Sequence, residues 1–119
     1  MSGPMRGPME GTVVCELDRI DPESGVAALV DGEAVAVFRL EDDAVYAVAN
    51  YDPFSGASVL ARGIVGSRGE VPTVASPMHK QVFDLRTGQC LDDAAVRVST
   101  YETAVVDGLI VVGGRREDL

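Results

Sequence analysis

Short apolar runs separated by turn-forming residues make up most of this 119-residue chain. The runs are rich in Val and Ala, and glycine, proline or acidic residues stand between them. No window of about eleven residues repeats its apolar positions with the period of about 3.6 that an amphipathic helix shows. Many short strands with frequent turns are typical of an antiparallel β-sandwich or barrel, so the pattern predicts an all-β fold. The expected strands span residues 12–17, 26–30, 34–40, 44–49, 71–75, 81–85, 96–99, 102–106 and 109–112.

Two Asp-Gly pairs mark the tightest turns of the predicted sheet. Asp31-Gly32 and Asp107-Gly108 each lie between two apolar runs. A two-residue hairpin turn needs positive φ at both positions, which Asp and Gly tolerate, so each pair predicts a hairpin. At residues 18–22 we expect a turn or a single turn of helix, because Pro22 blocks a longer helix.

The middle of the chain has a different pattern from both flanks. Residues 51–69 show no sustained period and contain two clusters of Pro, Gly and Ser. They predict loops, with one short turn of helix near Val59-Leu60. Pro72 stands near the start of the next expected strand, which predicts a position at a sheet edge.

The composition is that of one globular domain. The apolar fraction is 46%, and a chain of this length buries one core but not two. Ten basic residues against nineteen acidic ones give a net charge of −9, which excludes binding of nucleic acid through its phosphates. Such a charge can steer the chain toward a basic face of a protein partner. No apolar run reaches the roughly 20 residues that a membrane-spanning helix needs.

We expect a single domain at residues 12–112 with a short extension at each end. Residues 1–11 predict a flexible polar leader that lacks the apolar region of a secretory signal, so the expected location is the cytoplasm. Residues 113–119 are charged and predict a mobile tail. Cys15 and Cys90 are far apart and form no C-x-x-C motif, so both are expected to be free thiols in a buried or half-buried position.

Two segments of the chain resemble the two halves of a Rieske [2Fe–2S] signature. Residues 76–79 read Ser-Pro-Met-His where the signature has C-P-x-H, and an aromatic strand and a Thr-Gly turn follow at residues 82–88. Residues 52–57 read Asp-Pro-Phe-Ser-Gly-Ala where the signature has C-P-H-x-G-A. The resemblance implies a Rieske-like antiparallel domain, with a small inserted loop subdomain at about residues 51–88.

Three of the four implied ligand positions hold residues that do not suit the cluster. A Rieske cluster needs two thiolates and two imidazoles. Asp52 and Ser76 offer oxygen where sulfur is required, Phe54 offers no ligand, and only His79 remains. We therefore predict no iron–sulfur cluster. A single metal ion on Asp52 and His79 is disfavoured, because catalytic zinc usually takes three protein ligands. The favoured interpretation is a hydrogen bond from Asp52 to the backbone or to His79 that holds the two loops together.

Within the Rieske-like proteins, the chain resembles the small subunit of cytoplasmic NAD(P)H-dependent nitrite reductase. The matching text is Asn50-x-Asp52-Pro53-Phe54, Val59-Leu60-x-Arg62-Gly63, Ala75-Ser76-Pro77 and Gly88-x-Cys90-Leu91-x-Asp93. This resemblance implies a non-catalytic subunit with no cofactor of its own. Its partner would be a large subunit that carries FAD, a [4Fe–4S] cluster and sirohaem and reduces nitrite to ammonium.

The resemblance also implies a docking surface at the tips of the two loops. Its candidate residues are Pro53, Phe54, Arg62, Pro77, Met78 and Lys80. Two of them have a second interpretation: Phe54 could instead turn inward and fill the vacated cluster volume, and Arg62, like Asp93, could simply fix a loop.

Two other functions stay open at this point. The chain could be a cluster-free interaction module of another oxidoreductase, such as an oxygenase system. It could also be a small ferredoxin that retains some metal, which the missing ligands strongly disfavour.

Overall fold

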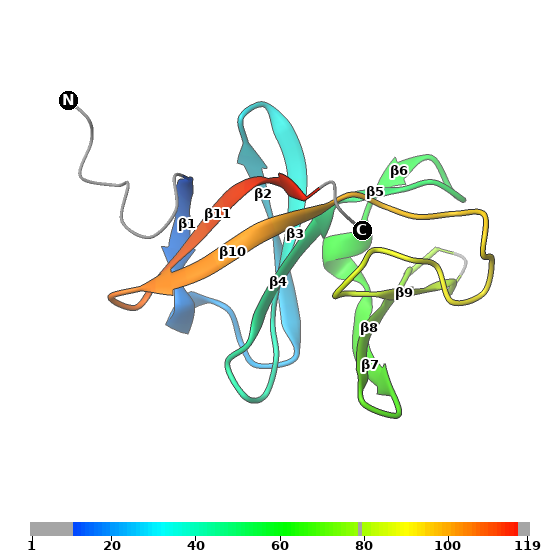
Figure 1. The fold of residues 1–119 in the computed structure, drawn as a ribbon, viewed down its shortest axis with the longest axis horizontal. Coiled ribbons are helices and arrows are strands. Elements are labelled where there is room, and N and C mark those ends of the chain that lie inside the picture. The colour runs from blue at the N-terminus through cyan, green and yellow to red at the C-terminus, as the bar shows by residue number, and fades with distance from the viewer. Residues whose placement is uncertain (1–10, 79, 117–119) are drawn as a thin grey trace.

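The computed structural model describes residues 11–78 and 80–116, and these form an antiparallel all-β fold (Figure 1). The fold class predicted from the sequence is confirmed. The larger sheet has six strands in the order β1-β11-β10-β4-β3-β2. Its strands are β1 Thr12–Glu16, β2 Ser24–Val30, β3 Glu33–Arg39, β4 Val45–Ala49, β10 Thr100–Val106 and β11 Leu109–Arg116. The short 3₁₀ helix η2, Leu17–Arg19, links β1 to β2, as the expected single turn of helix.

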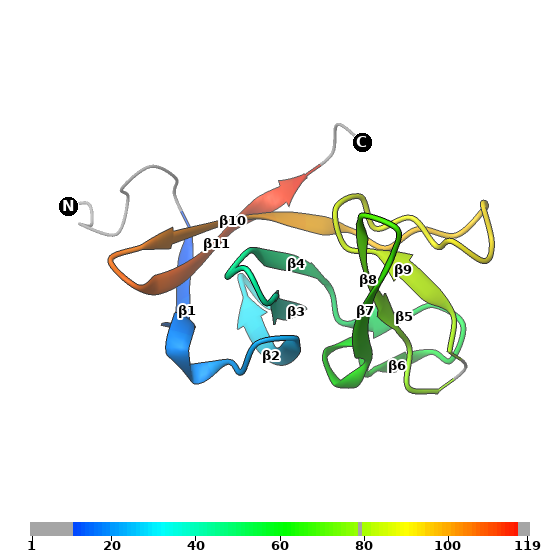
Figure 2. The same ribbon diagram turned by 90° about the horizontal axis from the view of Figure 1, so that it is seen from below.

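An insert between β4 and β10 carries two smaller sheets and lies to one side of the six-stranded sheet (Figure 2). β5 pairs with β6, and β8 lies between β7 and β9. The elements of the insert are β5 Tyr51–Asp52, β6 Ala57–Ser58, η3 Leu60–Arg62, β7 Ile64–Arg68, β8 Val71–Ala75 and β9 Val82–Asp84. The 3₁₀ helix η3 contacts β2 and β3 and so attaches the insert to the larger sheet.

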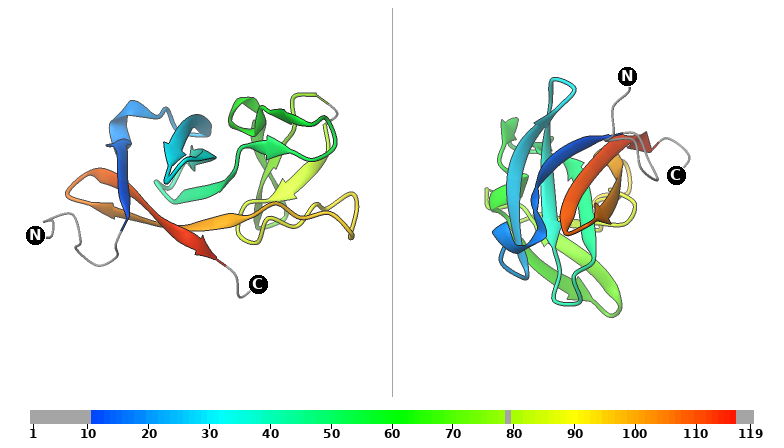
Figure 3. Two further views of the ribbon diagram at one scale, coloured as in Figure 1. Left: turned by 90° about the horizontal axis from the view of Figure 1, so that it is seen from above. Right: turned by 90° about the vertical axis from the view of Figure 1, so that its left-hand side faces the viewer.

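Both predicted Asp-Gly hairpins are confirmed. Asp31 and Gly32 have φ values of 52° and 81°, and Asp107 and Gly108 have values of 53° and 79°. Positive φ at both central residues is the geometry that matches the twist of paired strands. The views from above and from the side in Figure 3 show how strongly these hairpins twist.

Strand β3 is buried on both faces and serves two hydrophobic cores. Val35 and Val37 belong to a core inside the six-stranded sheet, whereas Ala36 and Phe38 belong to a core beneath the insert. All four side chains are fully buried. Successive strand residues point to opposite faces, so an unbroken apolar run is what a strand covered on both sides requires. The insert supplies the second cover through Leu60, Val74, Phe83, Leu85, Cys90 and Val98.

For residues 51–69 the prediction was loops with one short turn of helix near Val59-Leu60; η3 confirms the helical turn, but the prediction of a loop was wrong for β7. Ile64–Arg68 pairs with β8 along its whole length, from Ile64↔Ala75 to Arg68↔Val71. Pairing with an apolar neighbour overrides the weak strand preference of Gly66 and Ser67. Pro72 is consequently in a central strand rather than at an edge. It is tolerated there because the ladder to β9 begins only at Thr73.

Two boundaries near the C-terminus also differ from the prediction. Residues 96–99 form no strand, and only an isolated bridge joins Arg97 to Gln89. β11 continues to Arg116, so residues 113–116 belong to the sheet and not to a mobile tail. The strand is longer because Arg115 and Arg116 pair with Tyr101 and Thr100. Residues 1–10 of the expected leader and 117–119 of the expected tail lie outside the described residues.

Both cysteines are free thiols, as expected, with Cys90 buried and Cys15 half-buried. Within residues 11–78 and 80–116, no helix is long and apolar enough to cross a membrane.

Candidate functional site

The structure brings together the two loops that the sequence singles out. The first loop, residues 52–56, joins β5 to β6, and the second, residues 76–81, joins β8 to β9. Ser76 Oγ donates a hydrogen bond of 2.5 Å to Asp52 Oδ2. Both residues are buried, with exposed fractions of 0% for Asp52 and 2% for Ser76. The two positions that the resemblance assigns to cysteine ligands are therefore in direct contact, through a carboxylate and a hydroxyl.

Each of these residues also shapes its own loop. The other carboxylate oxygen of Asp52 accepts a 2.9 Å hydrogen bond from the Phe54 amide, and Ser76 Oγ accepts one of 3.1 Å from the Met78 amide. Asp and Ser side chains commonly stabilise turns by accepting from the amide two residues ahead. The backbone bonds Gly56 N–H to Asp52 O and Lys80 N–H to Ser76 O then close the two turns. The expectation that Asp52 bonds to the backbone is confirmed.

The charge of Asp52 is stabilised where it lies. Burial raises the pKa of its carboxyl, but the hydrogen bonds from Ser76, Phe54 and Ser55 lower the pKa by more, so that it falls below its ordinary value. A carboxylate that accepts several hydrogen bonds favours its ionised form. Asp52 is therefore an anion at neutral pH, and Ser76 is the donor in the bond between them.

The residues at these positions do not fit a [2Fe–2S] cluster. Both oxygens of Asp52 and the hydroxyl of Ser76 are engaged in hydrogen bonds, and they are hard oxygen donors where iron–sulfur chemistry needs thiolates. At the third position, Phe54 is half-buried and packs against the core beneath the insert. Its ring centroid lies 6.2 Å from that of Phe83, at an interplanar angle of 51°. The fourth position, His79, lies outside the described residues. In the described part of the chain, no three or more His, Cys, Asp or Glu side chains lie close enough together to hold a metal ion.

Four of the expected docking residues are exposed at these loop tips. Pro53, Pro77 and Lys80 are exposed, and so is Met78, with 55% of its surface open. Phe54 instead is half-buried and packs against the core beneath the insert. Sequence reasoning missed the exposed apolar side chain of Ile64, because the strand that positions it, β7, was expected to be a loop. In a strand the outward position of Ile64 follows from the inward position of its neighbour Val65.

Arg62 lies on a separate element, η3. Its side chain is exposed. The guanidinium forms no hydrogen bond or ion pair with the rest of the described chain. The interpretation of Arg62 as a residue that fixes a loop thus finds no contact in support. Asp93 does fix its loop, because its carboxylate accepts a 3.0 Å hydrogen bond from the Ala95 amide.

Asn50 organises the base of the first loop, a role that the sequence did not reveal. It is buried, and its side chain donates to the Ser58 carbonyl at 3.2 Å and accepts from the Ala61 amide at 2.7 Å. Its backbone carbonyl also accepts from the Leu60 amide. A buried asparagine at the end of a strand is the signal that could have pointed to this role.

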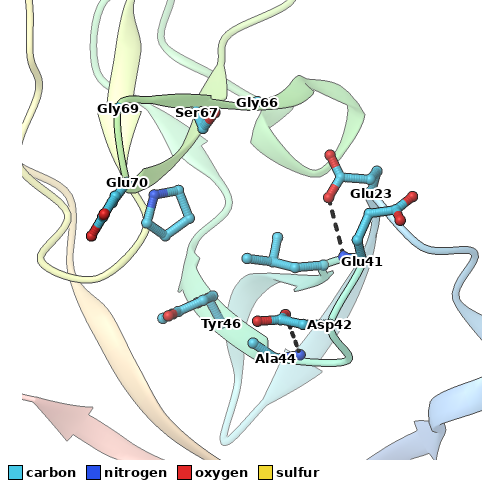
Figure 4. A pocket seen from close by; sticks show the side chains of 11 residues that line it. Glu23, Glu41, Asp42, Ala44, Tyr46, Gly66, Ser67, Gly69 and Glu70 are labelled. Carbon is cyan, nitrogen blue, oxygen red and sulfur yellow. Dashed lines mark hydrogen bonds between the residues drawn. The ribbon is translucent and has the colours of Figure 1, made fainter.

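An acidic cleft lies between the β7–β8 hairpin and residues 40–46, which include the turn between β3 and β4 (Figure 4). It has a volume of about 440 Å³, and its acidic lining residues are Glu23, Glu41, Asp42 and Glu70. Two of these carboxylates accept hydrogen bonds from backbone amides: Glu23 accepts from the distant Glu41 amide, and Asp42 accepts from the nearby Ala44 amide. The cleft contributes to the acidic surface expected from the net charge.

Comparison with known proteins agrees with this geometry. The model of the family described as Rieske-like [2Fe-2S] domain matches residues 12–113. The small subunit of nitrite reductase (NADH) from Escherichia coli K12 is 43% identical over 102 residues, which cover 85% of this chain and 94% of that protein. A solved structure from Mycobacterium tuberculosis, named as an NADH-dependent nitrite reductase small subunit, shares 47% identity. Its TM-score is 0.85, with 92% of this chain and 97% of that one covered.

Two further similar proteins are a large subunit of nitrite reductase and a ferredoxin. The nitrite reductase [NAD(P)H] large subunit of Klebsiella oxytoca is 37% identical over 103 residues, which cover 87% of this chain but 11% of that protein. The ferredoxin of carbazole 1,9a-dioxygenase from Nocardioides aromaticivorans shares 30% identity at a TM-score of 0.77, covering 87% of this chain and 96% of the ferredoxin. The chain therefore belongs to the nitrite reductase small subunits, a group within the Rieske-like domain family.

Proposed function

We propose that this chain acts in the cytoplasm as the small subunit of an NAD(P)H-dependent nitrite reductase, in the assimilation of nitrate and nitrite. It docks onto the large subunit and contributes neither a catalytic residue nor a redox cofactor. The FAD, [4Fe–4S] cluster and sirohaem belong to the large subunit, where nitrite is reduced to ammonium. The observation that carries the proposal is the similarity to a complete small subunit, at 43% identity over 94% of its length.

The match to a large subunit supports a direct partnership. In the Klebsiella oxytoca protein, a region similar to this chain is part of the same polypeptide that bears the name of the large subunit. Covalent linkage holds two domains at a high effective concentration. A free small subunit must replace that linkage by affinity, so we expect a specific interface on this chain.

The loop tips are the best candidate for that interface. Pro53, Pro77 and Met78 present apolar surface, and Lys80 and Arg62 add positive charge to a chain whose net charge is −9. Interfaces often combine an apolar centre with a charged rim. Because the Asp52–Ser76 pair lies buried beneath the tips, the exposed residues are held on an ordered base.

A pull-down from native extract tests the proposal. The tagged chain should recover a large flavoprotein with a sirohaem spectrum. Met78→Glu should reduce this recovery about tenfold or more, because it places a charge in the apolar centre of the interface. Leu29→Glu is the matched control, since Leu29 is also exposed but lies on β2 in the other sheet. Equal loss in both variants would contradict docking through the tips.

Docking to an oxygenase is the second candidate, because a carbazole dioxygenase ferredoxin shares this fold at 30% identity. As a cluster-free interaction module of an oxygenase system, the chain would have less similarity behind it, since its identity to a nitrite reductase small subunit is higher, at 43%. Recovery of an oxygenase component in the same pull-down would support it and would remove the nitrite assignment.

A further inference from the structure

The fold family implies a [2Fe–2S] cluster, and the residues of this chain do not fit one. In a Rieske domain the cluster is also a cross-link, because four ligands bind the same pair of irons. A bound metal of this kind usually supplies part of the free energy that orders its ligand loops. A chain that lacks the ligands needs another means of holding the two loops together.

The two loops have matching local structures. Asp52-Pro53-Phe54 and Ser76-Pro77-Met78 are both tripeptides in which the first side chain accepts a hydrogen bond from the third amide. The bond from Ser76 Oγ to Asp52 Oδ2 joins these turns. A continuous chain of three hydrogen bonds therefore runs from the Met78 amide, through Ser76 and Asp52, to the Phe54 amide. Such chains strengthen each other when they are buried and fully satisfied.

The Asp52–Ser76 bond is the one hydrogen bond that connects residues 52–56 with the described part of the loop at residues 76–81. The other bonds of these two loops stay within one loop, such as Lys80 N–H to Ser76 O. Its carboxylate and hydroxyl are both buried, so water does not compete for them and breaking the bond leaves a buried charge without its partner.

We infer that the buried Asp52–Ser76 hydrogen bond replaces the iron–sulfur cluster as the cross-link between the two loops, so that the loop tips are ordered without any metal. The polar pair stands at the two former cysteine positions, and it fixes Pro53 and Pro77 by holding the residues on both sides of each. This cross-link orders the loops of the isolated chain, so it can be tested independently of docking to a large subunit.

Hydrogen exchange of single amides, followed by NMR on the isolated full-length chain, tests the cross-link. Ser76→Ala removes the hydroxyl from the second loop. If the bond couples the loops, exchange should accelerate about tenfold or more at the Phe54 amide in the first loop, as well as at Met78. A purely local turn at Ser76 would change Met78 alone, and that outcome would overturn the inference.

Two further variants complete the test. Asp52→Asn keeps the volume and an acceptor for the Phe54 amide but weakens the bond to Ser76, so exchange at Met78 should accelerate. Asp93→Ala removes a comparable turn in another loop and should leave both tip amides protected. The Val37 amide in β3 should keep its protection in all three variants, which separates local opening from global unfolding.

Two further treatments test whether a metal contributes to the order of the loops. In one, the chelator EDTA is added to the chain; in the other, ferrous iron and sulfide are added under reducing conditions. EDTA should leave the protection of Phe54 and Met78 unchanged, and iron with sulfide should give no stable visible absorbance. Loss of protection in EDTA, or a coloured protein that retains iron and acid-labile sulfide, would overturn the inference.

Discussion

Tyr101 and Glu33 meet across an intervening strand: the phenol of Tyr101 on β10 donates a 2.6 Å hydrogen bond to Glu33 at the start of β3, and β4 lies between these strands. Arg115 on β11 donates to the same carboxylate at 2.8 Å. Burial and the Glu33 carboxylate together raise the pKa of Tyr101 to about 12. This group of three residues links β3, β10 and β11 at one end of the six-stranded sheet, across the intervening strand β4.

The raised pKa of Tyr101 predicts a loss of stability at high pH. A phenol whose pKa is raised by folding stabilises the folded state below about pH 10, and this contribution disappears as the pH rises toward about 12. Tyr101→Phe should remove that alkaline decline and should cost about 1 kcal/mol of unfolding free energy at neutral pH. Urea unfolding at a series of pH values measures both effects. Tyr46→Phe is the control, because the Tyr46 hydroxyl bonds to no other described residue. An equal cost in both variants would contradict the prediction.

The lowered pKa values of two carboxyl groups predict acid sensitivity. Hydrogen bonds from Arg115 and Tyr101 lower the pKa of Glu33. Burial raises the pKa of Asp52, but the hydrogen bonds that its carboxylate accepts lower it by more. Such groups stabilise the folded state above their unfolded pKa of about 4, and this stabilisation is lost as the pH falls through the folded values. Glu33→Gln should therefore flatten the dependence of melting temperature on pH below about pH 5. A variant with the same acid profile as the parent chain would show that Glu33 does not contribute.

The packing of Phe54 against Phe83 predicts a stability role beside any role in docking. Phe54→Ala removes a half-buried ring and should cost about 2 kcal/mol, less than a fully buried phenylalanine. Phe54→Leu keeps most of the volume and should lose less. Thermal unfolding gives the stability change, and affinity for the large subunit is measured in parallel. A large loss of affinity with unchanged stability would instead place the ring in the interface.

Lys80 has a φ of +67°, a strained value for a residue with a side chain. Lys80→Gly should relieve this strain and raise stability by up to about 1 kcal/mol, although glycine gains freedom in the unfolded chain. Lys80→Ala removes the same charge without relieving the strain. If the two variants weaken docking equally but differ in stability, the Lys80 charge contributes to binding of the large subunit. The strained backbone at Lys80 then lowers the stability of the unbound chain. Equal stability of both variants would argue against strain at this position.

Gly88 follows the aromatic strand, with a φ of +81°. A Cβ atom there would come within 2.0 Å of the Val98 carbonyl oxygen. Gly88→Ala should therefore cost more than about 2 kcal/mol in chemical denaturation, since both the conformation and the space forbid a side chain. Gly69 is the matched control, because its φ is also positive, at +61°, but a Cβ would meet open space. Gly69→Ala should show the smaller cost of φ alone.

The sequence predicted what depends on neighbours along the chain and missed what depends on distant partners. The Asp-Gly hairpins were predictable because two residues set their geometry. Strand β7 was not predictable, because its pairing with β8 outweighs the weak strand propensity of its own residues. The acidic cleft combines Glu23, Glu41 and Glu70 from three separate turns, and no local pattern links them.

The bond between Asp52 and Ser76 was predictable in part. The resemblance in the sequence marked both as implied ligand positions, and it predicted a bond from Asp52 to the backbone or to His79. The backbone part of that prediction is confirmed by the Phe54 amide. The partner Ser76 could have been inferred, because two ligands of one metal must lie within a few ångströms of each other.

Burial of β3 on both faces has a consequence for how this protein could evolve or be engineered. Val35 and Val37 hold one core while Ala36 and Phe38 hold the other, so the insert is no detachable cassette. Excising residues 50–99 would strip the cover from Phe38, and grafting them onto another sheet would require a strand with the same two-sided pattern. The six-stranded sheet and the insert therefore have to be inherited or engineered together, as one unit built around β3.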